Sequence, residues 1–108
     1  MTKPLPQALA AFYAAKNNHD IEGALAQFTT DAIVKDEGQI RNGHAEIRAW
    51  LEETAREYND TAEVLDVEEH EGTHLVSARI TGTFPGSPVT LSFRYTLRDG
   101  RIAQLEIV

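Results

Sequence analysis

Apolar residues recur at helical spacing in three segments of the first half of the chain. Residues 5–17 carry an apolar stripe at steps of about one turn, which predicts an amphipathic helix. A shorter stripe follows Asp20, a residue suited to cap a helix, and predicts a second helix from Ile21 to about Phe28. Residues 44–58 repeat the pattern and predict a third helix.

The second half of the chain alternates apolar and polar residues with a period of two. Four segments show this alternation and predict consecutive strands: residues 61–71, 74–84, 88–98 and 101–108. A further short strand is expected at residues 32–38, between a turn at residues 29–31 and a turn at Asn42-Gly43. Helices followed by an antiparallel meander predict an α+β fold in which the helices lie on one face of a curved sheet.

Composition and charge narrow the class of protein. With 42% hydrophobic and 25% charged residues, we expect residues 1–108 to form a single domain. The net charge of −7 argues against nucleic acid and anionic membranes as partners. Cysteine is absent, and no apolar run has the character of a signal peptide or the length of a membrane span. These features predict a cytoplasmic protein.

Residues 70–74 read HEGTH and fit the pattern H-E-x-x-H, in which two histidines bind zinc and the glutamate is a general base. That chemistry needs a helix, because only there do residues four apart point the same way. Gly72 instead stands between two alternating segments, where a hairpin turn is expected. We therefore interpret Glu71-Gly72 as a hairpin turn with His70 and His74 at the surface, and we expect no metal site.

Asp36 is the residue best placed for acid–base chemistry. Strand alternation puts Ala32, Val34 and Asp36 on one face. If that face is inward, a carboxylate lies at the rim of an apolar cavity and can act as a general base. The alternative is that Asp36 ends the strand in solvent, or accepts backbone hydrogen bonds in the turn before Gly38.

Other polar residues are open to two interpretations. Tyr13 and Trp50 lie on core-facing stripes and could either pack in the core or line a pocket. His44 stands near the start of the third helix, and we interpret it as solvated in preference to a proton shuttle. Arg94 and Arg98 share the polar face of a strand, which favours a solvated or dimer-facing surface over an anion site.

The order of these motifs resembles the nuclear transport factor 2-like superfamily, in particular its SnoaL-like and ketosteroid-isomerase-like branch. The resemblance rests on an aromatic helix at FYAAKNN, a short helix at Asp20–Phe28, the run DAIVKD at residues 31–36, and Gly43 before Ile47 and Trp50. It covers nearly the whole chain.

The resemblance implies a cone-shaped α+β barrel, in which a strongly curved antiparallel sheet wraps around three helices and encloses an apolar pocket. It also implies a homodimer formed through the sheet, and it places Asp36 at the position of the catalytic base in ketosteroid isomerases. The isomerases hold an enolate with a tyrosine and a protonated aspartate. These positions fall at Phe12 and Phe93 here, and neither side chain donates a hydrogen bond, so steroid isomerisation is not expected.

Two functions follow as expectations. One is a cofactor-independent acid–base enzyme (an isomerase, cyclase or dehydratase) acting on an apolar small molecule, with Asp36 as general base. The other is a non-catalytic homodimeric module of the same fold that binds a hydrophobic ligand or a protein. The residues expected to line the pocket are Tyr13, Val34, Trp50, Phe93 and Tyr95.

Overall fold

The computed structural model describes residues 5–107 and contains three helices in this part of the chain. The helix α1 spans Gln7–Asn17, α2 spans Ile21–Leu25 and α3 spans Gly43–Tyr58. Asp20 caps α2, since its carboxylate accepts a hydrogen bond from the backbone N–H of Gly23 at 3.0 Å. The single domain was expected over residues 1–108, of which residues 1–4 and 108 lie outside the described part. The last strand was expected to end at Val108, which is one of these residues.

Six strands form one mixed sheet in the order β2-β1-β6-β5-β4-β3. Their bounds are β1 Phe28–Asp36, β2 Gln39–Asn42, β3 Thr61–His70, β4 Thr73–Thr81, β5 Val89–Arg98 and β6 Arg101–Ile107. All neighbouring pairs are antiparallel except β1 and β6, which run parallel. A parallel pair needs a long connection, and here the whole chain from β2 to β5 supplies it.

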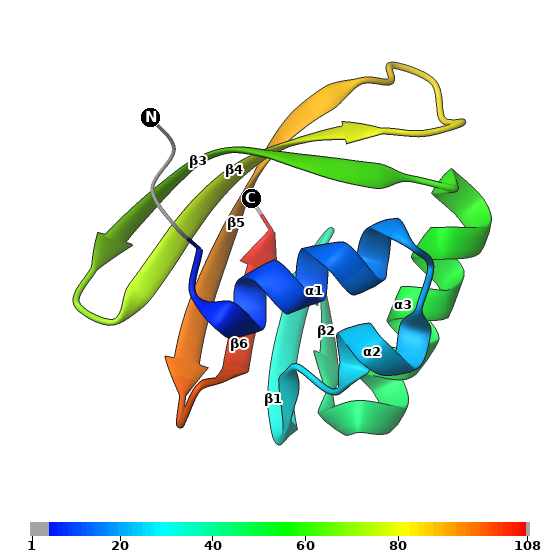
Figure 1. Ribbon diagram of the computed structural model, residues 1–108. Helices are drawn as coiled ribbons and strands as arrows, with labels where there is room; N and C mark the ends of the chain where they lie inside the picture. Colours follow the sequence, from blue (N-terminus) through cyan, green and yellow to red (C-terminus); the bar gives the residue numbers. More distant parts are fainter. Residues whose placement is uncertain (1–4, 108) are drawn as a thin grey trace.

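The sheet is strongly curved but not closed, and it curls around α1 (Figure 1). The long strands β3, β4 and β5 bend over α1, while α3 packs at one side against β1 and β2. The concave face of the sheet and the inner faces of the helices form a single core. Its largest fully buried side chains include Tyr95, Phe12, Phe28, Leu9 and Ile47. The α+β architecture expected from the sequence is thus confirmed.

The structure corrects several local predictions. The second helix ends at Leu25, and Phe28, which was expected at its end, is the first residue of β1. Thr29, Thr30 and Asp31 belong to β1 and do not form a turn, because β1 begins at Phe28 beside β6. Residues 39–42 form the strand β2, which pairs with the end of β1 through a tight turn at Glu37-Gly38. Because β1 runs parallel to β6, the sheet is mixed. The sequence predicted a purely antiparallel sheet.

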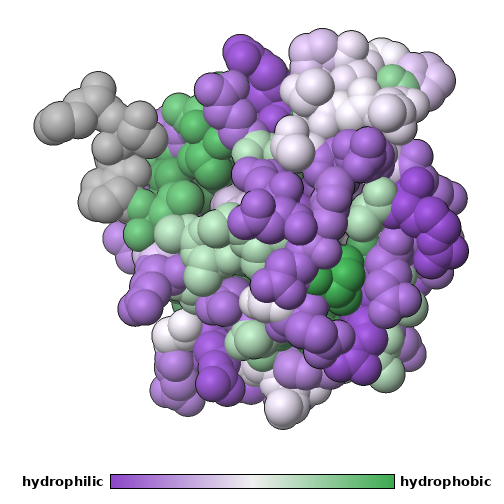
Figure 2. Space-filling model, turned by 45° about the vertical axis from the view of Figure 1, so that its right-hand side comes forward, coloured by the Kyte–Doolittle hydropathy of each residue, from purple (hydrophilic) through white to green (hydrophobic). Residues whose placement is uncertain are grey.

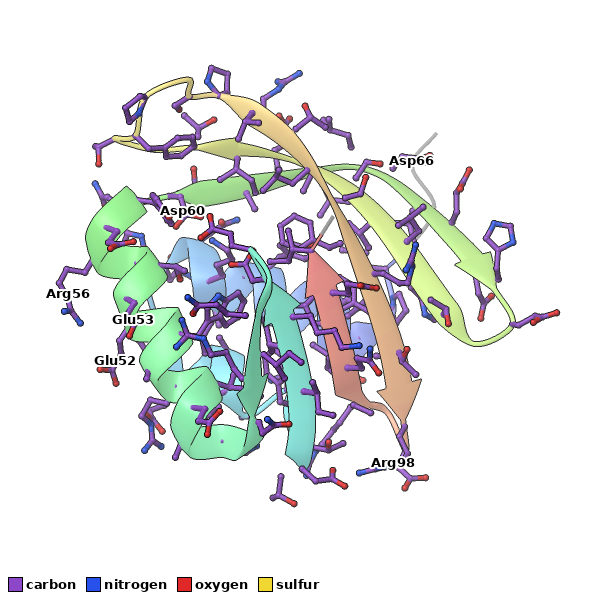
Figure 3. All side chains as sticks on the ribbon, turned by 180° about the vertical axis from the view of Figure 1, so that it is seen from behind. Glu52, Glu53, Arg56, Asp60, Asp66 and Arg98 are labelled. Carbon is purple, nitrogen blue, oxygen red and sulfur yellow. The ribbon has the colours of Figure 1, made fainter. Side chains whose placement is uncertain are left out.

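The surface is mainly polar on the face shown in Figure 2, where one group of hydrophobic residues gathers at the upper left. On the outer side of α3, Glu52 and Arg56 project away from the sheet (Figure 3), whereas the Glu53 carboxylate lies 3.3 Å from the Arg41 guanidinium of β2. No helix among the described residues is long and apolar enough to cross a membrane.

Candidate active site

A cavity of about 240 Å³ opens at one end of the curved sheet. Two helices contribute to its walls, through the end of α1 and the inner face of α3. The remaining walls come from the end of β1, Asp60 just before β3, the start of β5, the ends of β4 and β6, and the loop between β4 and β5. The apolar part of the lining consists of Trp50, Ile80, Phe84, Val89, Leu91, Phe93 and Ile107. The polar part consists of Lys16, Asp36, Glu37, Thr54, Tyr58 and Asp60.

Asp36 lies at the end of β1 with its carboxylate on the cavity wall. The strand alternation has the predicted phase, since Ala32 and Val34 are both fully buried and Asp36 is half-buried on the same side. The indole Nε1–H of Trp50 donates a hydrogen bond to Oδ2 of Asp36 over 3.0 Å. No described residue donates to the other oxygen, Oδ1. One carboxylate oxygen is therefore bonded to α3, and the other accepts no hydrogen bond from the described residues.

A buried ion pair forms another part of the wall. Lys16, in the last turn of α1, places its Nζ 2.6 Å from Oδ2 of Asp60, which stands just before β3. The two side chains are only 13% and 9% exposed. Figure 3 shows Asp60 between the end of α3 and the curled strands. Lys16 is the one cation lining the cavity among residues 5–107.

The five residues expected to line the pocket divide into two groups. Trp50 and Phe93 lie on the cavity wall. Tyr13, Val34 and Tyr95 are buried in the core beside it and are not part of the wall. For Tyr13, packing in the core was the alternative that the helical stripe had left open.

Tyr13 and Tyr95 form a hydrogen-bonded pair inside the core. The Tyr95 hydroxyl donates to the Tyr13 hydroxyl over 2.8 Å, and neither ring is more than 4% exposed. Burial raises the pKa of Tyr13 well above its usual value, although the hydrogen bond from Tyr95 opposes part of that rise. Burial, together with the neighbouring Tyr13, also raises the pKa of Tyr95. Both phenols therefore stay neutral around pH 7.

Tyr58 and Phe84 pack against each other at the cavity wall, with ring centroids 5.6 Å apart in an edge-to-face arrangement. The Glu37 carboxylate, more than burial, raises the pKa of Tyr58. The loop that carries Phe84 is fixed to α3, because the Thr83 N–H donates to the Tyr58 carbonyl over 2.9 Å. Gly82 is required there, since a Cβ would lie 2.3 Å from that carbonyl oxygen.

The HEGTH segment forms the hairpin turn between β3 and β4, as predicted. Glu71 and Gly72 both have positive φ, of 52° and 83°, and occupy the two turn positions. The expectation that both histidines are at the surface is wrong for His74. The His70 side chain is 77% exposed, but that of His74 is 12% exposed, because it faces inward across from Tyr95.

The other histidine considered from the sequence, His44, is only partly solvated. Its Nε2 lies 3.0 Å from the backbone carbonyl oxygen of Phe28, and the residue is half-buried. No three His, Asp or Glu side chains of residues 5–107 gather closely enough to hold a metal ion.

Sequence reasoning missed Lys16, Asp60 and Phe84 as cavity residues. Lys16 was visible as a cation on the apolar stripe of the first helix, which is a signal of a buried charge with a partner. Its partner was not visible, because Asp60 is 44 residues away in the chain. Phe84 was assigned to the strand predicted over residues 74–84, but β4 ends at Thr81 and Phe84 lies in the loop that follows.

The curved sheet and the three helices together define a small α+β domain with a carboxylate on the wall of its cavity. The chain belongs to the SnoaL-like domain family, whose model matches residues 9–105. This places it in the nuclear transport factor 2-like superfamily and confirms the resemblance found in the sequence.

Solved structures with the same fold agree. A candidate polyketide cyclase from Sinorhizobium meliloti is 36% identical, with a TM-score of 0.93 over 96% of this chain and 95% of that one. A protein of ketosteroid isomerase-like fold from Catenulispora acidiphila is 17% identical, with a TM-score of 0.85 over 97% and 86% of the two chains. The epoxide hydrolase/cyclase-like enzyme SalBIII of salinomycin pyran ring formation is 18% identical, with a TM-score of 0.82 over 94% and 86%. No curated protein sequence matches this chain.

Proposed function

We propose that this protein is a small acid–base enzyme that needs no cofactor and acts on an apolar small molecule, with Asp36 as the general base. The observation that carries the proposal is a carboxylate with one fixed and one available oxygen on the wall of a largely apolar cavity. Fixing Oδ2 through Trp50 orients Oδ1, and orientation of a base toward a bound C–H bond contributes to catalysis.

The reaction class is proton removal next to a carbonyl group, as in isomerisation, cyclisation or dehydration. In each case a carbon–hydrogen bond breaks, the proton passes to the Asp36 carboxylate, and the electron pair is delocalised onto the carbonyl oxygen. The 36% identity to a candidate polyketide cyclase supports a cyclase among these possibilities, because an aldol-type ring closure begins with the same proton transfer.

The cavity limits the size of the substrate. Its volume of about 240 Å³ lies below the range of about 300–1,000 Å³ that is usual for ligand pockets. The cavity therefore favours a molecule with a single ring or a short chain over a four-ring steroid. Leu91, Phe93 and Ile107 on the wall supply apolar contact.

The proposal is tested with cyclohex-3-enone, a neutral ring ketone with an activated C–H bond. In D₂O, NMR should show enzyme-dependent deuterium incorporation next to the carbonyl group. Asp36→Asn should lower that rate about 10²-fold or more. Asp66→Asn, an exposed aspartate of β3 outside the cavity, is the matched control and should leave the rate unchanged. A wild-type rate equal to that of buffer would contradict the proposal.

A second candidate is a non-catalytic module that binds a hydrophobic ligand or a protein. It is favoured by Phe12 and Phe93, which are buried and bring no hydrogen-bond donor to the positions where the isomerases hold an enolate. For this candidate, Asp36→Asn should leave ligand affinity unchanged, and calorimetry with any molecule that co-purifies with the protein would measure it.

We further propose that the protein forms a homodimer through the outer face of its sheet. That face carries polar side chains of β5 and an ion pair between Arg94 and Glu106 at 2.9 Å. Light scattering should give twice the chain mass, and Arg94→Glu should shift the equilibrium toward the monomer. A monomeric wild-type protein at high concentration would refute the dimer.

A further inference from the structure

Proton removal by Asp36 has an electrostatic requirement that the base itself does not meet. The negative charge that leaves the carbon accumulates on the carbonyl oxygen, and a preorganised donor near that oxygen lowers the barrier strongly. Phe12 and Phe93 supply no such donor. The structure must therefore hold one elsewhere if the proposed function, on which this inference rests, is correct.

Few polar groups of the cavity wall are free to serve. The Trp50 N–H is bonded to Asp36, and the Thr54 hydroxyl donates to the carbonyl of Leu51 over 3.2 Å. Tyr58 lies in the field of the Glu37 carboxylate, and its neutral phenol brings no positive charge that would offset a second negative charge there. Lys16 remains, and it is the cation of the wall.

We propose that Lys16 is a second catalytic residue, which stabilises the oxyanion formed when Asp36 removes the proton. A lysine ammonium has three N–H bonds, and described residues accept only one of them, through Oδ2 of Asp60 at 2.6 Å. The side chain is 13% exposed, so its remaining donors act in a poorly hydrated site, where a hydrogen bond to an oxyanion is strong. Asp60 is a positioning residue that fixes the ammonium.

A purely structural role for this ion pair is already filled by its neighbour. The side-chain amide of Asn17 accepts from the Ala62 N–H over 2.7 Å and donates to the Ala62 carbonyl over 2.9 Å. These two bonds fasten the end of α1 to the start of β3. The ion pair of Lys16 and Asp60 joins the same two parts of the chain, and both of its side chains line the cavity.

The charges of the wall also select the class of substrate. Lys16 faces three carboxylates on this wall, those of Asp36, Glu37 and Asp60. A substrate anion would be repelled by the excess negative charge, whereas a neutral ketone would not. When the proton moves to Asp36, that carboxyl becomes neutral as the charge appears on the oxygen at Lys16. The net charge of the site is then unchanged, so a neutral single-ring ketone or enone is the substrate class that fits.

The C–H bond next to the carbonyl breaks, and its proton forms an O–H bond with Oδ1 of Asp36. The electron pair forms the C=C bond of the enolate, and the carbonyl π pair moves to oxygen. Lys16 keeps its proton and donates a hydrogen bond to that oxygen. Return of the proton to another carbon completes an isomerisation without any external oxidant or reductant.

The decisive experiment measures oxyanion binding apart from catalysis. The variant Asp36→Asn imitates the state in which Asp36 has taken the proton, and the probe is 4-nitrophenol, whose phenolate resembles an enolate and whose absorption reports its protonation. The phenolate should bind roughly 10- to 100-fold more weakly to the double variant D36N/K16M than to D36N. The matched control D36N/K35M removes a lysine outside the cavity and should bind like D36N.

Turnover of cyclohex-3-enone provides the second measurement. Lys16→Met should lower kcat roughly 10²- to 10³-fold with little change in KM, and Lys16→Arg should restore part of the loss. Lys16→Gln replaces Lys16→Met if the latter does not fold, as judged by thermal unfolding.

The outcomes separate the two proposals. Equal phenolate binding by D36N and D36N/K16M, or no binding of 4-nitrophenol by any variant, overturns the role of Lys16 whatever the catalytic result. Phenolate binding that is weakened in D36N/K16M only, combined with no turnover by the wild type, overturns the enzymatic function. Lys16 would then remain an oxyanion-binding residue.

Discussion

Trp50 and Asp36 are joined by a hydrogen bond of 3.0 Å that connects the inner face of α3 to the end of β1. The acceptor is the Asp36 carboxylate, and the donor residue, Trp50, is only 5% exposed. A hydrogen bond of this kind also stabilises the fold. Its two partners are 14 residues apart, and both belong to the cavity wall.

The first prediction concerns the strength of that bond. In a double-mutant cycle of Trp50→Phe and Asp36→Ala, we expect a coupling energy of about 1.5 kcal/mol, the lower end for a hydrogen bond to a charged group. Urea unfolding followed by circular dichroism measures it, since the variant lacks the sole tryptophan. Trp50→Phe combined with Asp66→Asn is the control and should be additive. Additivity of the first pair as well would show that the bond contributes nothing.

The second prediction concerns the buried tyrosine pair. Tyr95→Phe leaves the Tyr13 hydroxyl without its partner, and Tyr13→Phe leaves the Tyr95 hydroxyl without an acceptor. Each single change should lower the free energy of unfolding by about 1–3 kcal/mol, the cost of an unsatisfied buried polar group. The double variant Y13F/Y95F removes both groups and should lose less than the sum of the single losses. A loss equal to that sum would argue against the pairing.

The third prediction concerns alkaline pH. Tyr13 and Tyr95 have pKa values raised above the unfolded value of about 10. Above that pH the unfolded chain releases protons that the native state retains, so the stabilisation by these groups is full below about pH 10 and is lost as the pH rises. The slope should approach about 1.4 kcal/mol per pH unit for each tyrosine.

Urea unfolding between pH 8 and 11 would measure this slope, with Y13F/Y95F as the reference for all other titrating groups. The reference should lose less stability over the same interval. Parallel curves for the wild type and the double variant would contradict the raised pKa values.

The fourth prediction concerns the hairpin turn of HEGTH. Glu71 has a φ of 52°, a left-handed conformation that asparagine adopts more readily than glutamate, and Gly72 follows it with a φ of 83°. Glu71→Asn should therefore raise the free energy of unfolding by about 0.5–1 kcal/mol.

The hairpin at Asp99-Gly100 supplies the reciprocal control. Asp99 and Gly100 have nearly the same φ values as Glu71 and Gly72, 52° and 77°. Aspartate, which adopts the left-handed conformation readily, already occupies the first turn position. Asp99→Glu should destabilise by a similar amount. If Glu71→Asn proved neutral or destabilising in thermal unfolding, another contact of Glu71 would have to outweigh its backbone strain.

The elements themselves were largely readable from the sequence. Period-3.6 stripes located three helices, and period-two alternation located the long strands, because each element buries one face against a common core. The errors fell at residues 28–31 and 39–42, where short stretches carry no clear strand periodicity, and at residues 82–84, which were expected to continue the strand that ends at Thr81. In the first two stretches, pairing with β6 and with β1 decides that the backbone is extended.

For the site, the sequence alone determined that Asp36 shares a face with Val34, since strand geometry fixes side-chain direction locally. It also determined that HEGTH contains a turn, since Gly72 stands between two segments that alternate as strands. The tertiary structure alone decided that β1 runs parallel to β6, that Tyr13 meets Tyr95 across 82 residues, and that Lys16 meets Asp60 across 44. Periodicity records which face of an element is buried, but not which distant element covers it. The partner of each buried polar group, and with it the chemistry of the cavity, is therefore settled only by packing.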